Sequence, residues 1–297
     1  MEERGASQRR VCGLLGWHRS TIRYRSGAEK REQLLAGLRE LARARVRWGY
    51  RRLHQGLLRQ GWVVSRSRVY RLYRRSQLGL QRRRSRRRRV TAAGAGARPA
   101  AVGCNQVWTM DFLHDRLTSG RRFRVFDVLD QFSRECLAFA AEGRLRGEDV
   151  VGVLERVQRW RGVPEVIVVD NGGEFRGGRL AAWAQRAGVR LHFSRPGQPT
   201  DNPFIESFHG RLRDECLNLE AFEDLEEVRT ALEAWRQDYN HNRPHSSLGW
   251  LTPAEKAAVS LRVSSVAPEL RSPPAPCAPV QRTATPAVGD ATFPGVS

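Results

Sequence analysis

Seven arginines occupy the eight residues 82–89, within QRRRSRRRRV, and this run divides the chain into two unlike parts. Like charges at this density repel one another and cannot pack into a core, so the run is predicted to stay extended until it meets a polyanion. The segment TAAGAGARPA (91–100) that follows has the composition of a flexible linker. We therefore expect an Arg-rich linker over residues 81–104, with a domain on either side.

Formal charge differs sharply between the two parts. Residues 1–100 hold 28 Lys and Arg and 5 acids, a net charge of +23, whereas residues 101–297 hold 24 and 26, a net charge of −2. A basic front on a near-neutral body indicates a polyanion-binding arm fused to a second domain. Nucleic acid and an anionic membrane surface are both candidate partners. No stretch is long and apolar enough to span a bilayer, and MEERGASQRR does not resemble a signal peptide.

Chain length and cysteine usage narrow the possible class of protein further. With 297 residues, 40% of them hydrophobic, the chain can bury one good core and a second, smaller domain. Its five cysteines are scattered without C-x-x-C spacing. That pattern predicts the reduced thiols of a cytoplasmic protein rather than a disulfide framework, and we expect no zinc.

Two helical units are predicted ahead of the arginine run. Residues 1–28 suggest a partial helix-turn-helix around Gly16, although an ordinary helical hairpin is the stronger interpretation of this stretch alone. Residues 29–80 suggest three more helices, the last with Val69, Leu72 and Tyr73 inward. An Arg-lined third helix suits insertion into the major groove of DNA. The candidate DNA-binding residues are Arg66, Arg68, Arg71, Arg74, Arg75, Arg82, Arg83, Arg84, Arg86, Arg87, Arg88 and Arg89.

From about residue 105 the pattern changes to short strands. The segments 107–113, 121–130 and 133–140 are predicted strands, close enough in sequence to form antiparallel hairpins. A predicted helix (147–160) leads to the wholly apolar strand PEVIVV (164–169), another helix (177–187) and a last strand (189–193). This order indicates an α/β core, a mixed sheet with packed helices, over residues 105–262. Residues 263–297 are predicted to be a disordered Pro- and Ala-rich tail.

Three acids are candidates for chemistry: Asp111, Asp170 and Glu206. Proteins that cut DNA commonly hold divalent cations on carboxylates beside the scissile phosphate. Asp111 lies mid-strand, where an unpaired acid is costly unless the position is an exposed edge. Asp170 ends the apolar strand, where open sheets bind ligands, or else it simply forms a turn. Glu206 either holds metal or complements the dipole of its helix.

The segment PTDNPFIESFHGRLRDECLN (199–218) predicts the helix that carries Glu206, with Asn202 as N-cap. Its core-facing stripe is expected to be Ile205, Phe208, Leu212, Cys216 and Leu219. Asp214 and Glu215 are interpreted as a solvated face, and Asp127 as a loop or strand-edge acid.

Three further polar residues are interpreted as structural rather than functional. Glu174, four residues after Asp170, is expected to face solvent rather than to touch metal. In YNHNRPHSSLG, His241 and His245 are interpreted as loop structure, with DNA contact as the alternative.

The blocks WTMDF, VVDNGGEF and DNPFIESFHGRLRDECLN resemble the three catalytic blocks of DDE transposases with a retroviral-integrase-type core. The nearest resemblance is to the second-reading-frame (OrfB) products of bacterial insertion sequences. Thirty-five residues separate Asp170 from Glu206, the separation typical of that family. The resemblance extends over residues 8–258, and three blocks in order make it specific.

The resemblance implies an RNase-H-like fold, with Asp111, Asp170 and Glu206 as catalytic residues that hold two Mg²⁺ ions, for which Mn²⁺ is a possible substitute. It implies hydrolysis at an element end and then attack by the freed 3′-hydroxyl on another DNA strand, without a covalent intermediate. It also implies double-stranded DNA partners (terminal repeats and target), a homodimer or higher oligomer on DNA, and a possible fusion with an upstream-frame protein. No membrane partner is expected, and the location would be cytoplasmic, with the bacterial nucleoid.

Two other functions remain open. A non-catalytic DNA-binding remnant or repressor of the element would show salt-sensitive DNA binding without metal-dependent nicking. An RNase-H-like nuclease would prefer an RNA–DNA hybrid over duplex DNA.

Overall fold

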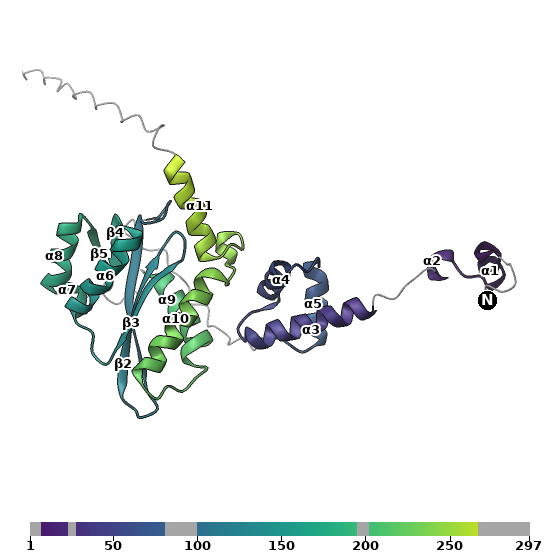
Figure 1. Cartoon of the computed structure of the whole chain (residues 1–297), viewed down its shortest axis with the longest axis horizontal. Coiled ribbons are helices and arrows are strands. Elements are labelled where there is room, and N and C mark those ends of the chain that lie inside the picture. The colour runs from purple at the N-terminus through teal and green to yellow at the C-terminus, as the bar shows by residue number, and fades with distance from the viewer. Residues whose placement is uncertain (1–6, 23–27, 81–99, 195–201, 267–297) are drawn as a thin grey trace, which may run out of the picture.

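The computed structural model describes residues 7–22, 28–80, 100–194 and 202–266. Figure 1 shows the order of the elements along the chain, from the N-terminal helices through the mixed core to α11. Within the described ranges, no helix combines the length and the apolar character needed to cross a membrane. The arginine run 82–89 and residues 267–297 of the predicted disordered tail lie outside the described residues, whereas residues 263–266, also predicted as tail, are helical.

The N-terminal part is entirely helical. Two short helices, α1 (Gln8–Leu15) and α2 (Arg19–Ile22), precede α3 (Ala28–Ala44), α4 (Tyr50–Arg59) and α5 (Arg66–Arg75). The last three share a hydrophobic core of their own, to which α3 contributes Leu34 and Leu38 and α4 contributes Leu53 and Leu57. The inward positions predicted for α5 are confirmed, because the residues buried on that helix are Val69, Leu72 and Tyr73. Burying one apolar face in this way holds such short helices together.

The predicted mixed sheet is confirmed, with the strand order β3-β2-β1-β4-β5. Strands β1 (Val107–Arg116), β2 (Arg122–Asp130) and β3 (Cys136–Glu142) pair antiparallel. Strands β4 (Val166–Val169) and β5 (Arg190–Phe193) run parallel to β1. All four residues of β4 are buried, as expected for an apolar strand covered on both faces. The central strand of the five is β1, so the edge interpretation of Asp111 is wrong.

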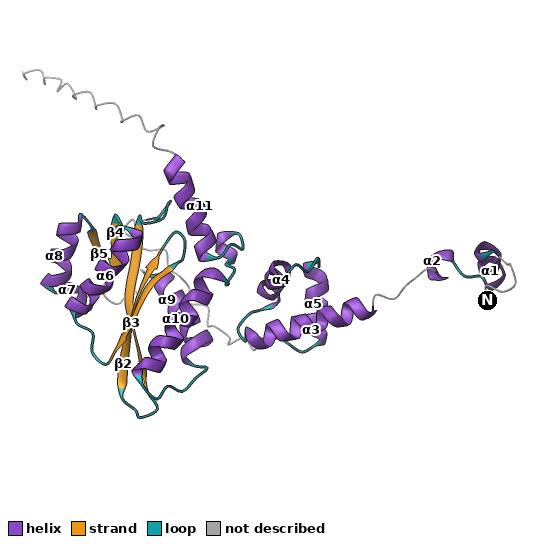
Figure 2. Ribbon diagram, in the orientation of Figure 1, coloured by secondary structure: helices purple, strands orange, loops and turns teal. Residues whose placement is uncertain are grey.

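Helices cover both faces of this sheet (Figure 2). On one face, Trp108 and Met110 of β1 pack in a core with α6 (Gly147–Arg161) and α8 (Gly178–Ala187), which is preceded by the short α7 (Gly173–Arg176). On the other face, Leu113 of β1 packs in a core with α9 (Pro203–Leu212) and α10 (Leu225–His241). A 3-10 turn (Ser246–Leu248) and α11 (Pro253–Val266) complete the core. Since side chains alternate along a strand, Asp111 faces α9.

One predicted helix stripe needs correction. The α-helix α9 continues as a π-helix, Arg213–Leu217, whose wider turn shifts the rotation of the residues that follow. Leu217 is buried, at 5% exposure, whereas Leu219, predicted to face the core, lies in the turn after the helix and is 51% exposed. The stripe through Ile205, Phe208, Leu212 and Cys216 is confirmed.

Candidate functional site

Asp111 lies in the middle of β1 on the face covered by α9. One oxygen, Oδ1, accepts a hydrogen bond of 2.7 Å from the Phe112 N–H. Burial first, and then the charges of Asp127 and Asp170, raise the pKa of Asp111 to about 6, against the lowering effects of His209 and of the Phe112 hydrogen bond. A carboxyl group held at such a pKa among other carboxylates has a local excess of negative charge, which a cation would relieve.

A buried pair lies directly beside Asp111. Asp127, its cross-strand partner on β2, is fully buried, and His209 of α9 donates a hydrogen bond of 2.6 Å from Nε2 to Asp127 Oδ2. The other ring nitrogen of His209, Nδ1, lies 3.8 Å from Asp111 Oδ2. Burial lowers the pKa of His209, but the charge and hydrogen bond of Asp127 outweigh burial and raise it overall.

The loop or edge position expected for Asp127 is therefore wrong. The sequence contained a signal for burial, because Asp127 lies two residues from Val125 and two from Leu129, and both of these are buried on the face of β2 that Asp127 shares. A buried carboxylate needs a hydrogen-bond partner. The sequence indicated this partner only indirectly, because His209 lies three residues after Glu206 and so shares a face of the predicted helix with it.

Asp170 follows the last residue of β4 and is exposed. Its Oδ1 accepts a hydrogen bond of 2.9 Å from the Gly172 N–H, so it forms the turn that the simpler interpretation expected. It also acts electrostatically on Asp111, whose pKa its charge raises. Forming the turn does not prevent Asp170 from acting in the site, because the hydrogen bond from the Gly172 N–H uses only one of its two carboxylate oxygens.

Glu206 lies in the first turn of α9, and its side chain is exposed. Asn202 stands at the N-cap position as expected, but its side chain does not cap the helix; Asn202 Oδ1 instead accepts a hydrogen bond of 2.7 Å from Thr109 Oγ1 on β1. That bond fixes the start of α9 against the sheet. Across the described residues, no group of three or more His, Cys, Asp or Glu side chains is arranged to hold a metal ion. The charge of Asp170 thus acts on Asp111, and Glu206 stands on the neighbouring helix α9.

Two acids expected at the solvent are engaged in ion pairs. Glu174 pairs with Arg124 of β2, and this hydrogen bond lowers the pKa of Glu174. Glu215 pairs with Arg243, whose side chain is only 3% exposed. Both partners are distant in sequence, which is why local pattern gave no sign of them.

The arginines predicted to contact DNA fall into two groups. Those on α5 are all exposed: Arg66, Arg68, Arg71, Arg74 and Arg75. The seven arginines of residues 82–89 lie outside the described residues. Other arginines of this unit contact the core instead, among them Arg45, which pairs with Asp238, and Arg59, which pairs with Glu255.

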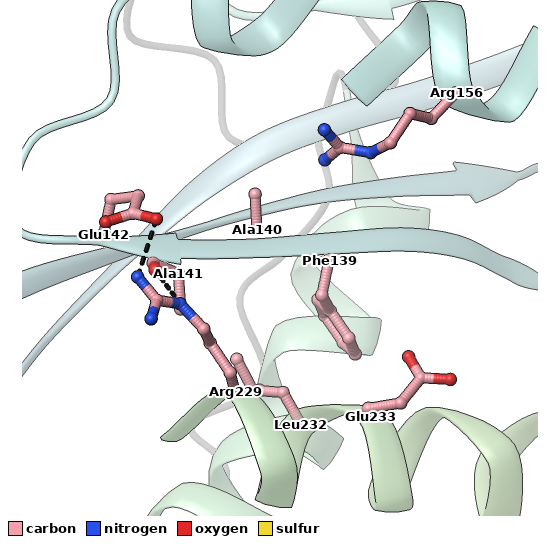
Figure 3. A pocket seen from close by; sticks show the side chains of 8 residues that line it. All are labelled: Phe139, Ala140, Ala141, Glu142, Arg156, Arg229, Leu232 and Glu233. Carbon is pink, nitrogen blue, oxygen red and sulfur yellow. Dashed lines mark hydrogen bonds and ion pairs between the residues drawn. The ribbon is translucent and has the colours of Figure 1, made fainter. Parts of the chain in front are cut away.

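One cavity, of about 270 Å³, lies between β3 and α10 (Figure 3). Across it, Arg229 of α10 forms a 2.7 Å hydrogen bond to Glu142 and a 3.2 Å bond to the Ala141 carbonyl, so this ion pair pins α10 to the edge strand. None of the three candidate acids lines this cavity. Its polar groups are explained by packing of the fold.

Comparison with known families identifies two kinds of domain. Integrase core domain models match residues 102–199 and residues 187–253, and an HTH-like domain model matches residues 29–89. The five-stranded mixed sheet with helices on both faces has the RNase-H-like arrangement expected of an integrase core. Among solved structures, the chain is similar to the HTLV-2 integrase catalytic core domain in complex with magnesium, with a TM-score of 0.42 and 14% identity over 52% of this chain and 98% of that one.

Relatives of similar length come from bacterial insertion elements. A 31.7 kDa protein of insertion element IS407 from Burkholderia multivorans is 42% identical, over 86% of this chain and 92% of the relative. A 39.2 kDa protein of insertion element IS476 from Xanthomonas euvesicatoria is 38% identical, over 87% and 74%. The transposase InsF for insertion sequence IS3A from Escherichia coli is 28% identical, over 73% and 79%. The resemblance seen in the three sequence blocks is thereby confirmed, and the chain belongs to the insertion-sequence transposase family that joins an HTH-like domain to an integrase core.

Proposed function

We propose that this protein is a metal-dependent DNA strand transferase, which cleaves the ends of its insertion element and joins them to target DNA. The single observation that carries the proposal is Asp111, a half-buried carboxyl group in the central strand whose pKa is raised to about 6, with a contribution from the charge of Asp170. Burying an acid beside other acids costs stability. A role in the reaction is the reason to retain such an arrangement.

The donor atoms suit a hard divalent cation. Asp111 and Asp170 each use Oδ1 to accept a backbone N–H, at 2.7 Å and 2.9 Å, which fixes the carboxylate and leaves Oδ2 for a ligand. Oxygen-only ligands and a local excess of negative charge favour Mg²⁺, with Mn²⁺ as a substitute. Metal bound there would activate a water or 3′-hydroxyl nucleophile and stabilise the leaving oxygen of a phosphodiester.

We assign Glu206 as the third acid of the site. It lies on the first turn of α9, the helix whose residue His209 already reaches both Asp111 and Asp127. The Thr109–Asn202 hydrogen bond and the His209–Asp127 pair both fix α9 against the sheet beside Asp111, so Glu206 is carried by a firmly anchored helix.

The DNA would be held by the basic front of the chain. The exposed arginines of α5 are assigned to the terminal repeats, and the arginines of residues 82–89 to backbone phosphates of the same duplex. Joining two element ends requires at least two copies of the chain on DNA. An upstream-frame protein, fused or separate, would contribute further end recognition, and the protein would act at the bacterial nucleoid.

A cleavage assay tests this proposal. DNA that flanks the gene on both sides would supply the terminal repeats as a labelled duplex, incubated with the full chain in Mg²⁺ or in EDTA. We expect Glu206→Gln to lose cleavage while still binding the duplex, and Glu155→Gln, an exposed acid on α6, to cleave normally. Cleavage by Glu206→Gln at the wild-type rate would overturn the assignment.

One observation favours a second function. Because no three acidic, His or Cys side chains of the described residues are grouped to hold a metal ion, a DNA-binding protein without catalysis, acting as a repressor of the element, would need no rearrangement. Salt-sensitive binding by the wild type, with no cleavage of authentic ends in Mg²⁺ or Mn²⁺, would favour this function.

A further inference from the structure

A second cavity, of about 230 Å³, opens on the other flank of α9. It lies between the start of α9, the end of β2 and the turn that follows α10, and its lining includes Arg134, Arg211 and His245. Exposed hydroxyl side chains, Ser207 and Ser247, stand at its border. A water molecule occupies about 30 Å³ of liquid, so the cavity has room for a group much larger than water.

Positive charge converges on this cavity. His245 is surrounded by four guanidinium groups, those of Arg243, Arg211, Arg52 and Arg134, and its pKa is lowered to about 2 by burial first and by these charges second. Burial also lowers the pKa of Arg134 and of Arg211. A neutral His245 can donate a hydrogen bond to an anion without adding to the repulsion among the arginines.

The nearby acids are already engaged. Glu215 is paired with Arg243, and the Asp130 carboxylate accepts hydrogen bonds from three backbone N–H groups and from the Ser133 hydroxyl. Among the described residues, no carboxylate forms an ion pair with Arg134 or Arg211. The cluster therefore carries more positive than negative charge, at a site partly withdrawn from water.

Three buried polar atoms of the cluster have no hydrogen-bond partner among the described residues: Arg134 Nη1, Arg243 Nη1 and His245 Nε2. His245 is only 4% exposed and lines the cavity itself, and Arg243 is 2% exposed. Leaving such donors unsatisfied is costly. Water would satisfy the hydrogen bonds but would not offset the charge, whereas an oxyanion does both.

Arg134 is held in place at a conformational cost. It adopts a φ of 64°, in the left-handed region that an arginine rarely occupies. Its guanidinium group lies 3.8 Å from the centre of the Phe204 ring on α9, a cation–π contact that fixes the group at the cavity. The turn between β2 and β3, in which the Arg134 N–H donates to the Asp130 carbonyl, sets this conformation, and it leaves Nη1 of Arg134 buried without a partner among the described residues.

The position on α9 relates this cavity to the acids. Phe204, Ser207 and Arg211 are three and four residues apart and share one face, while Glu206 and His209 share another. The apolar stripe of α9 separates the two faces. A strand of DNA that crosses the exposed side of α9 at Glu206 would therefore place a second phosphate near the cavity.

We propose that this cavity binds a backbone phosphate of DNA, a non-scissile one, and so anchors the strand on the opposite side of α9 from the acids. The inference deepens the proposed function, since it rests on DNA as the substrate. Arg134 and Arg211 would provide the charge, and His245 and Ser247 would provide neutral hydrogen bonds.

The first test places a negative charge at the border of the cavity. Binding of the full chain to a fluorescent duplex of arbitrary sequence is measured in EDTA for Ser247→Glu and for Ser246→Glu. Both serines are exposed and lie in the same 3-10 turn, but only Ser247 lines the cavity. We expect Ser247→Glu to weaken binding by about tenfold and Ser246→Glu to bind like wild type. Equal effects of the two changes would overturn the proposal.

The second test removes a charge from the cavity wall. The dependence of affinity on salt is measured for Arg211→Gln and for Arg236→Gln, a control whose guanidinium group is already paired with Glu233. Loss of one phosphate contact lowers the slope of log K against log salt by about 0.9, and we expect this only for Arg211→Gln. If Arg211→Gln folds and its slope of log K against log salt equals that of wild type, the proposal is contradicted. If Arg211→Gln does not fold, the comparison of Ser247→Glu with Ser246→Glu decides.

These measurements are independent of catalysis. EDTA blocks every metal-dependent step, so a wild type that cleaves nothing would still show the difference between Ser247→Glu and Ser246→Glu. Conversely, normal cleavage by wild type together with identical binding by the two serine variants would refute the cavity and leave the proposed function intact.

Discussion

Replacing Glu215 by alanine should destabilise the core far more than replacing its neighbour Asp214. Arg243 donates a 2.8 Å hydrogen bond from Nε to Glu215 Oε2 and a second from Nη2 to Oε1, and the two side chains are 3% and 14% exposed. Removing the carboxylate leaves a buried guanidinium group without its acid, which costs about 3–5 kcal/mol. Asp214 and Arg47 lie 3.3 Å apart, but their side chains are 51% and 46% exposed. An exposed pair of this kind contributes at most about 1 kcal/mol.

The assay is thermal unfolding of the full chain, followed by circular dichroism. For a folded unit of this size, 1 kcal/mol corresponds to about 2–4 °C, so Glu215→Ala should lower the Tm by about 6–20 °C and Asp214→Ala by less than about 4 °C. Converting both partners to apolar residues, Glu215→Leu with Arg243→Met, should recover most of the loss because no charge is then left buried. Equal Tm values for Glu215→Ala and Asp214→Ala would refute this reasoning.

Three further outcomes are expected. Gly56→Ala should destabilise the helical unit by about 1–3 kcal/mol in urea titrations, because the added Cβ would lie 2.7 Å from Leu41 Cδ2. Gly152→Ala, whose added Cβ would meet nothing within 4 Å, should be neutral or stabilising, and the reverse order of stabilities would contradict the packing. His209→Ala should lower the Tm more than His192→Ala, because it leaves the fully buried Asp127 unpaired while His192 is exposed; similar losses would disprove the pairing. The Arg59 hydrogen bond lowers the pKa of Glu255 from 4.5 to about 2, so the stabilisation by this bond is complete above pH 4.5 and is lost as the pH falls toward 2. Arg59→Gln should flatten the dependence of stability on pH in that range, and an unchanged dependence would argue against the bond.

Local pattern was sufficient for the elements but not for their partners. The strands were visible as short apolar or alternating segments, and the inward residues of α5 followed from helical spacing, so both could be predicted. The pairing of Glu215 with Arg243 depends on how α10 and the turn after it pack against α9, which no local pattern contains. The same limit explains Asp127, which was interpreted as a loop or strand-edge acid, because its partner His209 is 82 residues away in the sequence.

The exposure of Leu219 has a different cause. A longer α-helix would have continued the stripe through that position, but the helix closes with the π-turn Arg213–Leu217, which buries both Cys216 and Leu217, and Leu219 falls in the turn beyond it. For the site, the sequence blocks named three acids. The charge of Asp170 contributes to the raised pKa of Asp111, and the assignment of all three acids stays a prediction.

Joining of a labelled DNA end is the measurement that tests the central proposal most directly. A duplex of the element's terminal repeat with a free 3′-hydroxyl is incubated with a plasmid target, Mg²⁺ and the full chain, and labelled plasmid is counted. We expect joined product from wild type and from Asp115→Asn, a control on the same strand and face as Asp111, and none from Asp111→Asn, Asp170→Asn or Glu206→Gln. Joining by any of these three variants at the wild-type level would contradict the account.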